Sequence, residues 1–185
     1  MTSAATSSRP SPSGLAVVDK PAGWTSHDVV AKLRGVLGTR KVGHAGTLDP
    51  DATGVLLVGV GSVTRLLRWL SASDKAYSCE VGFGVETSTL DAAGEVTATH
   101  DMHVTLGDIV EVLPTFQGDI EQIPPMVSAI KIGGRRLHEL AREGKEVERA
   151  PRRVHVERIE IATTDDPLVY RMHVECSAGT YVRSL

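Results

Sequence analysis

The sequence predicts an α+β fold, with a mixed, mainly antiparallel β-sheet and flanking helices. Two segments, Ala76–Val85 and Leu168–Ser177, alternate apolar and polar residues with the period of two that strands show. Another segment, 29–37, repeats apolar residues at helical spacing. Strands and helices follow each other without the regular strand-helix-strand repeat of a parallel sheet. This mixture favours α+β over a doubly wound α/β fold.

The N-terminal elements can be predicted in chain order. Residues 1–14 are rich in Ser, Thr, Pro and Ala and contain little to bury, so we expect a disordered tail. One domain is expected over 15–185, because 185 residues with 41% hydrophobic content can bury one core. Its first strand, 15–18, runs into a turn containing Pro and Gly. Ser26 is the expected cap of a helix that ends at Gly38.

The later elements follow from the same signals. We expect a buried strand over 55–60 and an amphipathic helix over 62–70. Two adjacent glycines at 133 and 134 predict a tight hairpin or a strand-to-helix turn. The phase of the apolar residues changes between Val156 and Ile159, which predicts a β-bulge near Glu157 and Arg158.

Composition restricts the classes of function. No apolar run approaches the roughly 20 residues of a membrane-spanning helix, and the first residues lack a secretion signal. We therefore expect a cytoplasmic protein without membrane contact. Cys79 and Cys176 have no second ligand at metal-like spacing, so we predict two small core residues and neither a disulfide nor a metal site.

The net charge of -3 conceals a segregation of charges. Residues 76–130 contain nine acids and no Lys or Arg, whereas residues 131–158 contain nine cations and five acids. A charge run of this kind is compatible with a solvated helix face whose Arg and Glu side chains pair. It is equally compatible with a flexible arm that closes over a phosphate backbone.

The most unusual segment is the glycine-rich loop GHAGTLDPDATG at 43–54, which contains His44 and Asp49. Glycine lets a backbone approach a ligand closely, so a binding or catalytic loop is one interpretation. A structural Asx-type turn at Asp49 is another. The spacing Asp49-x-Asp51-x-Thr53 also resembles the nucleophile motif of magnesium-dependent aspartyl phosphatases, although here no apolar strand directly precedes it.

An ordered set of segments supports a more specific interpretation. Asp19-Lys20-Pro21-x-Gly23, the loop at 43–54, Lys75-Ala76-Tyr77, the stretch IPPMVSAIKIGGRRLHELAREG and Gly179-Thr180-Tyr181-Val182-Arg183 occur in this order. In order and spacing the chain strongly resembles the TruB family of tRNA pseudouridine-55 synthases, from Leu15 to Leu185. A guide-RNA-dependent relative of the archaeal and eukaryotic kind shares the loop and is a second possibility.

The resemblance implies a pseudouridine synthase catalytic domain that isomerises uridine in the T-loop of tRNA after flipping the base. It implies that Asp49 is the essential carboxylate, which either attacks the sugar or removes a sugar proton. Arg183 is the cation expected beside Asp49. The resemblance places Tyr77, Tyr181, His44 and Lys20 in or under the uracil pocket, and no cofactor or metal is implied.

The resemblance also assigns 124–153 as an RNA-clamping thumb, with phosphate-binding roles for Lys131, Arg135, Arg136, Arg142, Arg152 and Arg153. The partner is then the T-stem-loop of tRNA, and we expect a monomer with no protein partner. The family continues beyond the position of Arg183, so we expect a C-terminally truncated product. A noncatalytic tRNA-binding or folding module is therefore the alternative function.

Overall fold

The computed structural model describes residues 12–128 and 130–185, so the tail expected over 1–14 lies almost wholly outside the described residues. Gly14 is already the first residue of a strand. The chain divides into two compact units, residues 1–73 and residues 74–185. Each unit has its own sheet and core. The single domain expected over 15–185 stays a prediction.

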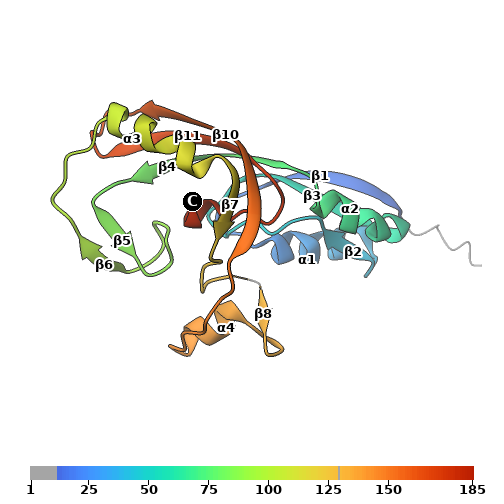
Figure 1. Ribbon diagram of the computed structural model, residues 1–185. Helices are drawn as coiled ribbons and strands as arrows, with labels where there is room; N and C mark the ends of the chain where they lie inside the picture. Colours follow the sequence, from blue (N-terminus) through green and yellow to red (C-terminus); the bar gives the residue numbers. More distant parts are fainter. Residues whose placement is uncertain (1–11, 129) are drawn as a thin grey trace, which may run out of the picture. The chain divides into compact units, whose positions relative to one another are not determined.

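The first unit is a three-stranded antiparallel sheet with the strand order β1-β3-β2. Helix α1 packs along one face of this sheet (Figure 1). Its elements are β1 (Gly14–Lys20), α1 (Ser26–Leu37), β2 (Val42–His44), β3 (Gly54–Val60), the 3-10 helix η1 (Gly61–Leu66) and α2 (Leu67–Ser71).

The core of the first unit lies between α1 and β3. Alternate residues of β3, Leu56 and Val58, pack against Val29 and Val30 of α1, and Val58 is fully buried. Burying one such side chain contributes roughly 1.5–3 kcal/mol. The predicted strand and helix are thus confirmed. Val36, which shares the helical spacing, is instead 68% exposed, because it lies away from the sheet.

The cap of α1 differs from the prediction by one residue. The Thr25 hydroxyl accepts a hydrogen bond from the Asp28 amide at 3.1 Å, and the Asp28 carboxylate accepts one from the Thr25 amide at 2.8 Å. This is a capping box, so Thr25 is the N-cap. Ser26 is buried, and its hydroxyl serves the glycine-rich loop described below. The predicted end of α1 at Gly38 is confirmed by its left-handed backbone, with φ 60°.

The helix predicted over 62–70 forms as two shorter pieces, η1 and α2. The β-branched side chains of Val63 and Thr64 disfavour an α-helical first turn. Leu67, where α2 begins, packs over Gly43 and Gly59, which lack the Cβ atoms that would crowd it. The break between η1 and α2 therefore coincides with the residue that packs against the sheet.

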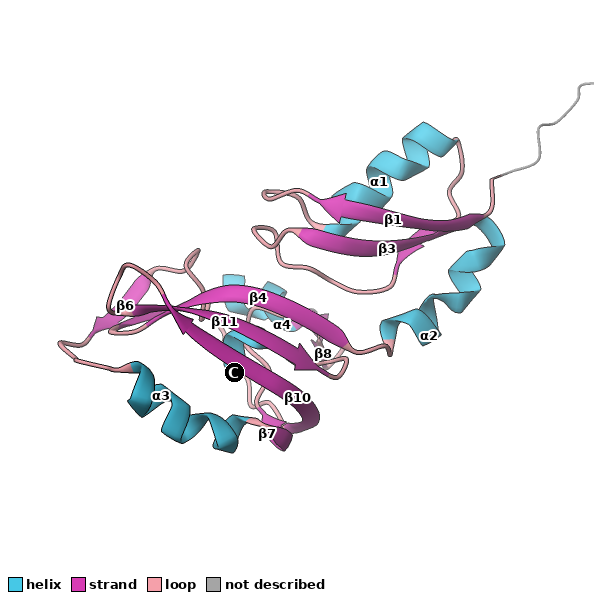
Figure 2. Cartoon of the chain, turned by 90° about the horizontal axis from the view of Figure 1, so that it is seen from above, coloured by secondary structure: helices cyan, strands magenta, loops and turns pink. Residues whose placement is uncertain are grey.

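The second unit contains a four-stranded antiparallel sheet with the order β4-β11-β10-β7. Helix α3 runs alongside this sheet (Figure 2). Two small hairpins, β5-β6 and β8-β9, extend from the unit. Its elements are β4 (Lys75–Gly82), β5 (Val85–Thr87), β6 (Val96–Thr99), α3 (Leu106–Val112), η2 (Leu113–Phe116), β7 (Gly118–Gln122), β8 (Lys131–Ile132), β9 (Arg135–Arg136), α4 (Leu137–Arg142), β10 (Arg152–Thr163), β11 (Val169–Cys176) and η3 (Val182–Ser184).

The alternating segments form the core of the second unit. In the sheet, Tyr77 lies opposite Val174 and Cys79 lies opposite Met172. The register shift between Val156 and Arg158 is the predicted bulge, and it places Val156 and Ile159 on the same buried face. Both cysteines are free and pack in this core, as predicted. The α+β class and the hairpin at the paired glycines are confirmed.

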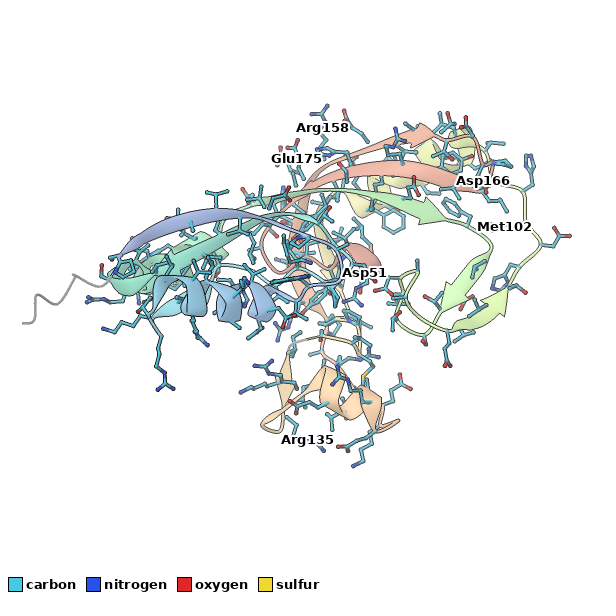
Figure 3. The ribbon with its side chains drawn as sticks, turned by 180° about the vertical axis from the view of Figure 1, so that it is seen from behind. Asp51, Met102, Arg135, Arg158, Asp166 and Glu175 are labelled. Carbon is cyan, nitrogen blue, oxygen red and sulfur yellow. The ribbon has the colours of Figure 1, made fainter. Side chains whose placement is uncertain are left out.

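The outward face of this sheet is polar. Figure 3 shows Arg158 and Glu175 side by side on it, and their charged groups are 3.9 Å apart. His155 of β10 interacts with Asp119 of β7 at 2.8 Å. None of the helices in the described residues is long and apolar enough to cross a membrane.

The contact between His155 and Asp119 gives a pH-dependent clip between β7 and β10. Hydrogen bonds to Asp119 and Glu157 raise the pKa of His155 above its ordinary value of 6.5. The clip therefore stabilises the fold fully between pH 3.8, the ordinary pKa of Asp119, and pH 6.5, and it is lost as the pH rises through the raised pKa of His155. Asp119→Asn should lower the pKa of His155 measured by NMR titration. Glu80→Gln, on distant β4, is the control, and equal pKa values in both variants would contradict the assignment.

Candidate active site

The loop that carries Asp49 connects β2 to β3 in the first unit and is fixed by backbone hydrogen bonds. The Ala45 amide donates to the Leu57 carbonyl at 2.9 Å, and the Ala52 amide donates to the Asp49 carbonyl at 3.1 Å. Between them, the Leu48 amide donates to the buried Ser26 hydroxyl at 3.0 Å. Asp49 is half-buried and lies within this held segment. Its backbone is therefore fixed on both sides before any ligand binds.

Lys20, at the end of β1, provides a further anchor for this loop. Its side chain is fully buried. The ammonium donates to the carbonyls of Pro21 at 2.9 Å, Trp24 at 2.5 Å and Pro50 at 2.9 Å. The Gly23 amide also donates to the Pro50 carbonyl at 2.9 Å. One buried ammonium thus ties the turn after β1 to the residue that follows Asp49.

The Lys20 ammonium also places a positive charge close to the carboxylates of the loop. Burial lowers the pKa of Lys20, and attraction to Asp51, Asp49 and Asp28 opposes this effect. A charged ammonium with three carbonyl partners is favoured over an isolated buried charge. Lys20 is therefore a cation that attracts the Asp49 carboxylate within the first unit, where sequence reasoning expected only Arg183.

His44, the last residue of β2, leads into the loop. Its ring is half-buried and meets the ring of His27 edge-on, with 5.0 Å between centroids. Burial lowers the pKa of His44, and a hydrogen bond with the Gly46 backbone only partly opposes this. A histidine in this setting is neutral near pH 7. The neutral His44 ring can therefore contact an uncharged nucleobase without placing a positive charge beside it.

The remaining predicted pocket residues belong to the second unit. Tyr77 of β4 is half-buried and packs against the core. Tyr181 and Arg183 lie in the C-terminal segment that forms η3. One set of predicted site residues, Asp49, Lys20 and His44, is thus positioned within the first unit. The other set, Tyr77, Tyr181 and Arg183, is positioned within the second. That both sets form one pocket, with Arg183 beside Asp49, stays a prediction.

Arg183 is held in place by several partners. Its guanidinium donates to the carbonyls of Thr89 and Val127, each at 3.1 Å, and lies 3.2 Å from the Asp91 carboxylate. The Arg183 side chain is only 14% exposed. An arginine with fixed partners presents its charge in one direction, as an oriented site requires.

Asp91 is a candidate site residue that sequence reasoning did not single out. Its carboxylate accepts hydrogen bonds from the Thr89 hydroxyl at 2.5 Å and from the Ala93 amide at 3.1 Å, in the turn between β5 and β6. The Asp-x-x-Gly pattern ending at Gly94 was readable as an Asx turn. Its pairing with distant Arg183 was not readable from one sequence.

The predicted thumb over 124–153 comprises β8, β9, α4 and the coil that leads to β10, projecting from the sheet (Figure 1). Arg135 forms an ion pair with Glu143, and hydrogen bonds from Arg135 and Lys145 lower the pKa of Glu143 to about 2. The other predicted RNA-binding cations form no ion pair within the described residues: Lys131, Arg136, Arg142, Arg152 and Arg153. Part of the charge run is thus paired internally and part is available to a polyanion.

Comparison with known proteins identifies the family of this chain. Residues 34–182 match the TruB family pseudouridylate synthase (N terminal domain). The chain belongs to this family. The matched region includes Asp49, Tyr77 and Tyr181.

Relatives within the TruB family are similar over most of this chain. The tRNA pseudouridine synthase B of Symbiobacterium thermophilum is 55% identical over 170 residues, which cover 90% of this chain and 56% of that protein. The tRNA pseudouridine synthase B of Rhodococcus jostii is 54% identical over 176 residues, which cover 93% and 58%. The chain therefore spans less than two thirds of the length of these relatives.

Solved structures agree with the family fold. A chain in the crystal structure of a Cbf5-Nop10-Gar1 complex is 31% identical, with a TM-score of 0.67, and the match covers 92% of this chain and 41% of that one. A chain in the structure of an H/ACA RNP bound to a substrate RNA containing 2'-deoxyuridine is 27% identical, with a TM-score of 0.64. Its match covers 92% of this chain and 40% of that one.

The anchoring role of Lys20 predicts a large effect on stability. Lys20→Met keeps the length of the side chain but leaves the carbonyls of Pro21 and Trp24 without this donor, while the Pro50 carbonyl keeps the Gly23 amide. A partly buried carbonyl that loses its donor costs about 1 kcal/mol, so the free energy of unfolding should fall by about 2 kcal/mol in urea titrations. Lys32→Met, at an exposed position of α1, is the control and should change it by less than about 0.5 kcal/mol. Equal effects of the two substitutions would contradict the anchor.

Proposed function

We propose that this protein isomerises uridine to pseudouridine in the T-loop of tRNA, at position 55. The observation that carries the proposal is the prepositioned Asp49 loop, held by Lys20 and Ser26 in a member of the TruB family. Relatives more than 50% identical are named tRNA pseudouridine synthase B. We expect it to act in the cytoplasm as a monomer.

In this reaction the bond between N1 of uracil and the sugar breaks, the base turns, and C5 bonds to the same sugar carbon. The proton on C5 is lost and N1 gains one, so no oxidant or energy source is needed. Asp49 begins the reaction either by attacking the anomeric carbon or by removing a sugar proton. Both roles require the carboxylate form, which the nearby Lys20 ammonium favours.

The other residues serve binding in this proposal. The uridine leaves its stack at a cost of a few kcal/mol, which contacts in the pocket must offset. Tyr77 would stack on the base, an interaction typically worth about 1–3 kcal/mol. Tyr181 and the neutral His44 would line the pocket. Arg183, oriented by Asp91, would supply positive charge beside Asp49.

The comparisons also bear on the substrate. The relatives named tRNA pseudouridine synthase B are 54–55% identical to this chain, whereas the chain from the Cbf5 complex is 31% identical. This difference supports tRNA as the substrate. The phosphatase interpretation of Asp49-Pro50-Asp51 loses its support, because the same residues lie inside the TruB family match.

Replacement of Asp49 tests the proposal. The protein is incubated with unmodified tRNA transcript and chelator, and pseudouridine is located by chemical derivatisation and mass spectrometry. Asp49→Asn should form no detectable product because the amide cannot act as carboxylate. Asp51→Asn should retain product, whereas an aspartyl phosphatase would need both aspartates. Product from Asp49→Asn at the wild-type rate would refute the proposal. RNA binding without product from the wild type would favour the noncatalytic tRNA-binding module.

The thumb makes a separate prediction about RNA affinity. Replacing Arg135, Arg136 and Arg142 together with Ala should weaken tRNA binding and flatten its dependence on salt. Each lost phosphate contact should make the slope of log K against log salt shallower by about 0.7–0.9. Arg135 is partly committed to Glu143, so we expect the slope to become shallower by about 2. Arg158→Ala with Arg171→Ala, on the outward sheet face, is the matched control. An unchanged slope in the triple variant would make this stretch an ordinary solvated surface.

A further inference from the structure

The segment that carries Tyr181 and Arg183 is fastened to the residues from which the thumb emerges. The side chain of Gln122, the last residue of β7, reaches the backbone of Tyr181. Its Oε1 accepts from the Tyr181 amide at 2.9 Å, and its Nε2 donates to the Tyr181 carbonyl at 3.2 Å. Gln122 is only 5% exposed. The Gln122 side chain therefore makes the same two hydrogen bonds to the Tyr181 backbone that a neighbouring strand would make.

Two further hydrogen bonds join the same segments. The Arg183 guanidinium donates to the Val127 carbonyl at 3.1 Å, and the Ser184 hydroxyl donates to the Ile123 carbonyl at 3.3 Å. Residues 122–127 run from the end of β7 into the first residues of the predicted thumb, so we call them the thumb root. The thumb root and residues 181–184 thus form one hydrogen-bonded node.

The glutamine matters to this node because its amide supplies a donor and an acceptor at once. A buried backbone amide and carbonyl left without partners cost about 1–3 kcal/mol each. The segment at 181–184 is a short 3-10 turn without a side-chain cap, so it has little regular structure of its own to fix it. The direction of the Arg183 guanidinium therefore depends on contacts made around the turn.

The pairing of β7 with β10 does not depend on the Gln122 side chain. Gln122 lies opposite Arg152 of β10 in the strand register, and this pairing of the backbones does not involve the Gln122 side chain. Asp91 and Thr89 hold Arg183 from the other side. Gln122 acts on Tyr181 and on the node, not on the strand pairing.

We propose that Gln122 is a positioning residue that sets Tyr181 and Arg183 for reaction by holding residues 181–184 against the thumb root. The inference rests on the proposed function. Because Gln122 is buried, we expect it to act without touching the RNA. Its loss should therefore lower the rate of the chemical step while leaving tRNA affinity and the salt dependence contributed by the thumb cations nearly intact.

The first test compares Gln122→Leu with Gln117→Leu. Gln117 is exposed and lies just before β7, so it is a matched control. We expect kcat of Gln122→Leu to fall by about 10²-fold, as displacements near 1 Å can do, with KM within about threefold of wild type. Rates are normalised to the folded fraction found by urea titration. Equal kcat values for the two variants, or a loss in KM alone, would overturn the inference.

The second test uses the isosteric Gln122→Glu and a pH profile. A protonated carboxyl has one donor and one acceptor, as the amide does, whereas a carboxylate has only acceptors and repels the Tyr181 carbonyl. Burial raises the pKa of a carboxyl, so the protonated form is reached at accessible pH. The ratio of kcat between Gln122→Glu and wild type should rise as pH falls. A ratio independent of pH would overturn the inference.

The two proposals fail in different ways. If the wild type forms pseudouridine and both Gln122 variants match it, only the positioning role falls. If the wild type forms none, the proposed function falls, and the positioning role falls with it. Wild-type product with a selective loss of kcat in Gln122→Leu supports both.

Discussion

The buried ammonium of Lys20 is the interaction on which the Asp49 loop depends. A lysine removed from water is unfavourable unless its three donors are satisfied, and here three carbonyls satisfy them. One of these carbonyls belongs to Pro50, beside Asp49. The charge therefore fixes the backbone of the loop and attracts the carboxylate that the proposed chemistry requires. Ser26 adds a neutral anchor at Leu48, so the loop is positioned from β1 and from α1.

In the second unit, the side chain of a cation is held by fixed partners in a similar way. Arg183 is held by a carboxylate and by carbonyls from two separate segments, the turn between β5 and β6 and the thumb root. Gln122 fixes the neighbouring backbone. In the first unit a buried cation holds the backbone beside an anion, and in the second a turn carboxylate holds a cation. In the proposed reaction, both arrangements would lower the reorganisation needed when charge develops.

The sequence predicted what local patterns determine. The alternation around Tyr77 and Val174, the bulge after Val156 and the glycine stop at Gly38 were readable because periodicity and backbone freedom are local properties. Thr25 was missed as the cap because the adjacent Ser26 looks equally suitable from the sequence. Asp91 and Gln122 were missed because their partners, Arg183 and Tyr181, are distant in the chain. The resemblance predicted roles for Asp49 and Lys20, but only the structure shows which groups Lys20 contacts.

The central claim is that Lys20 presets the loop in the absence of RNA. Amide hydrogen exchange of the RNA-free protein tests it most directly, because the Gly23 and Ala52 amides both donate within this loop assembly. We expect both amides to be protected in the wild type and to exchange much faster in Lys20→Met, with the amides of the β10-β11 ladder unchanged. Unprotected Gly23 and Ala52 in the wild type, or equal protection in Lys20→Met, would contradict the account.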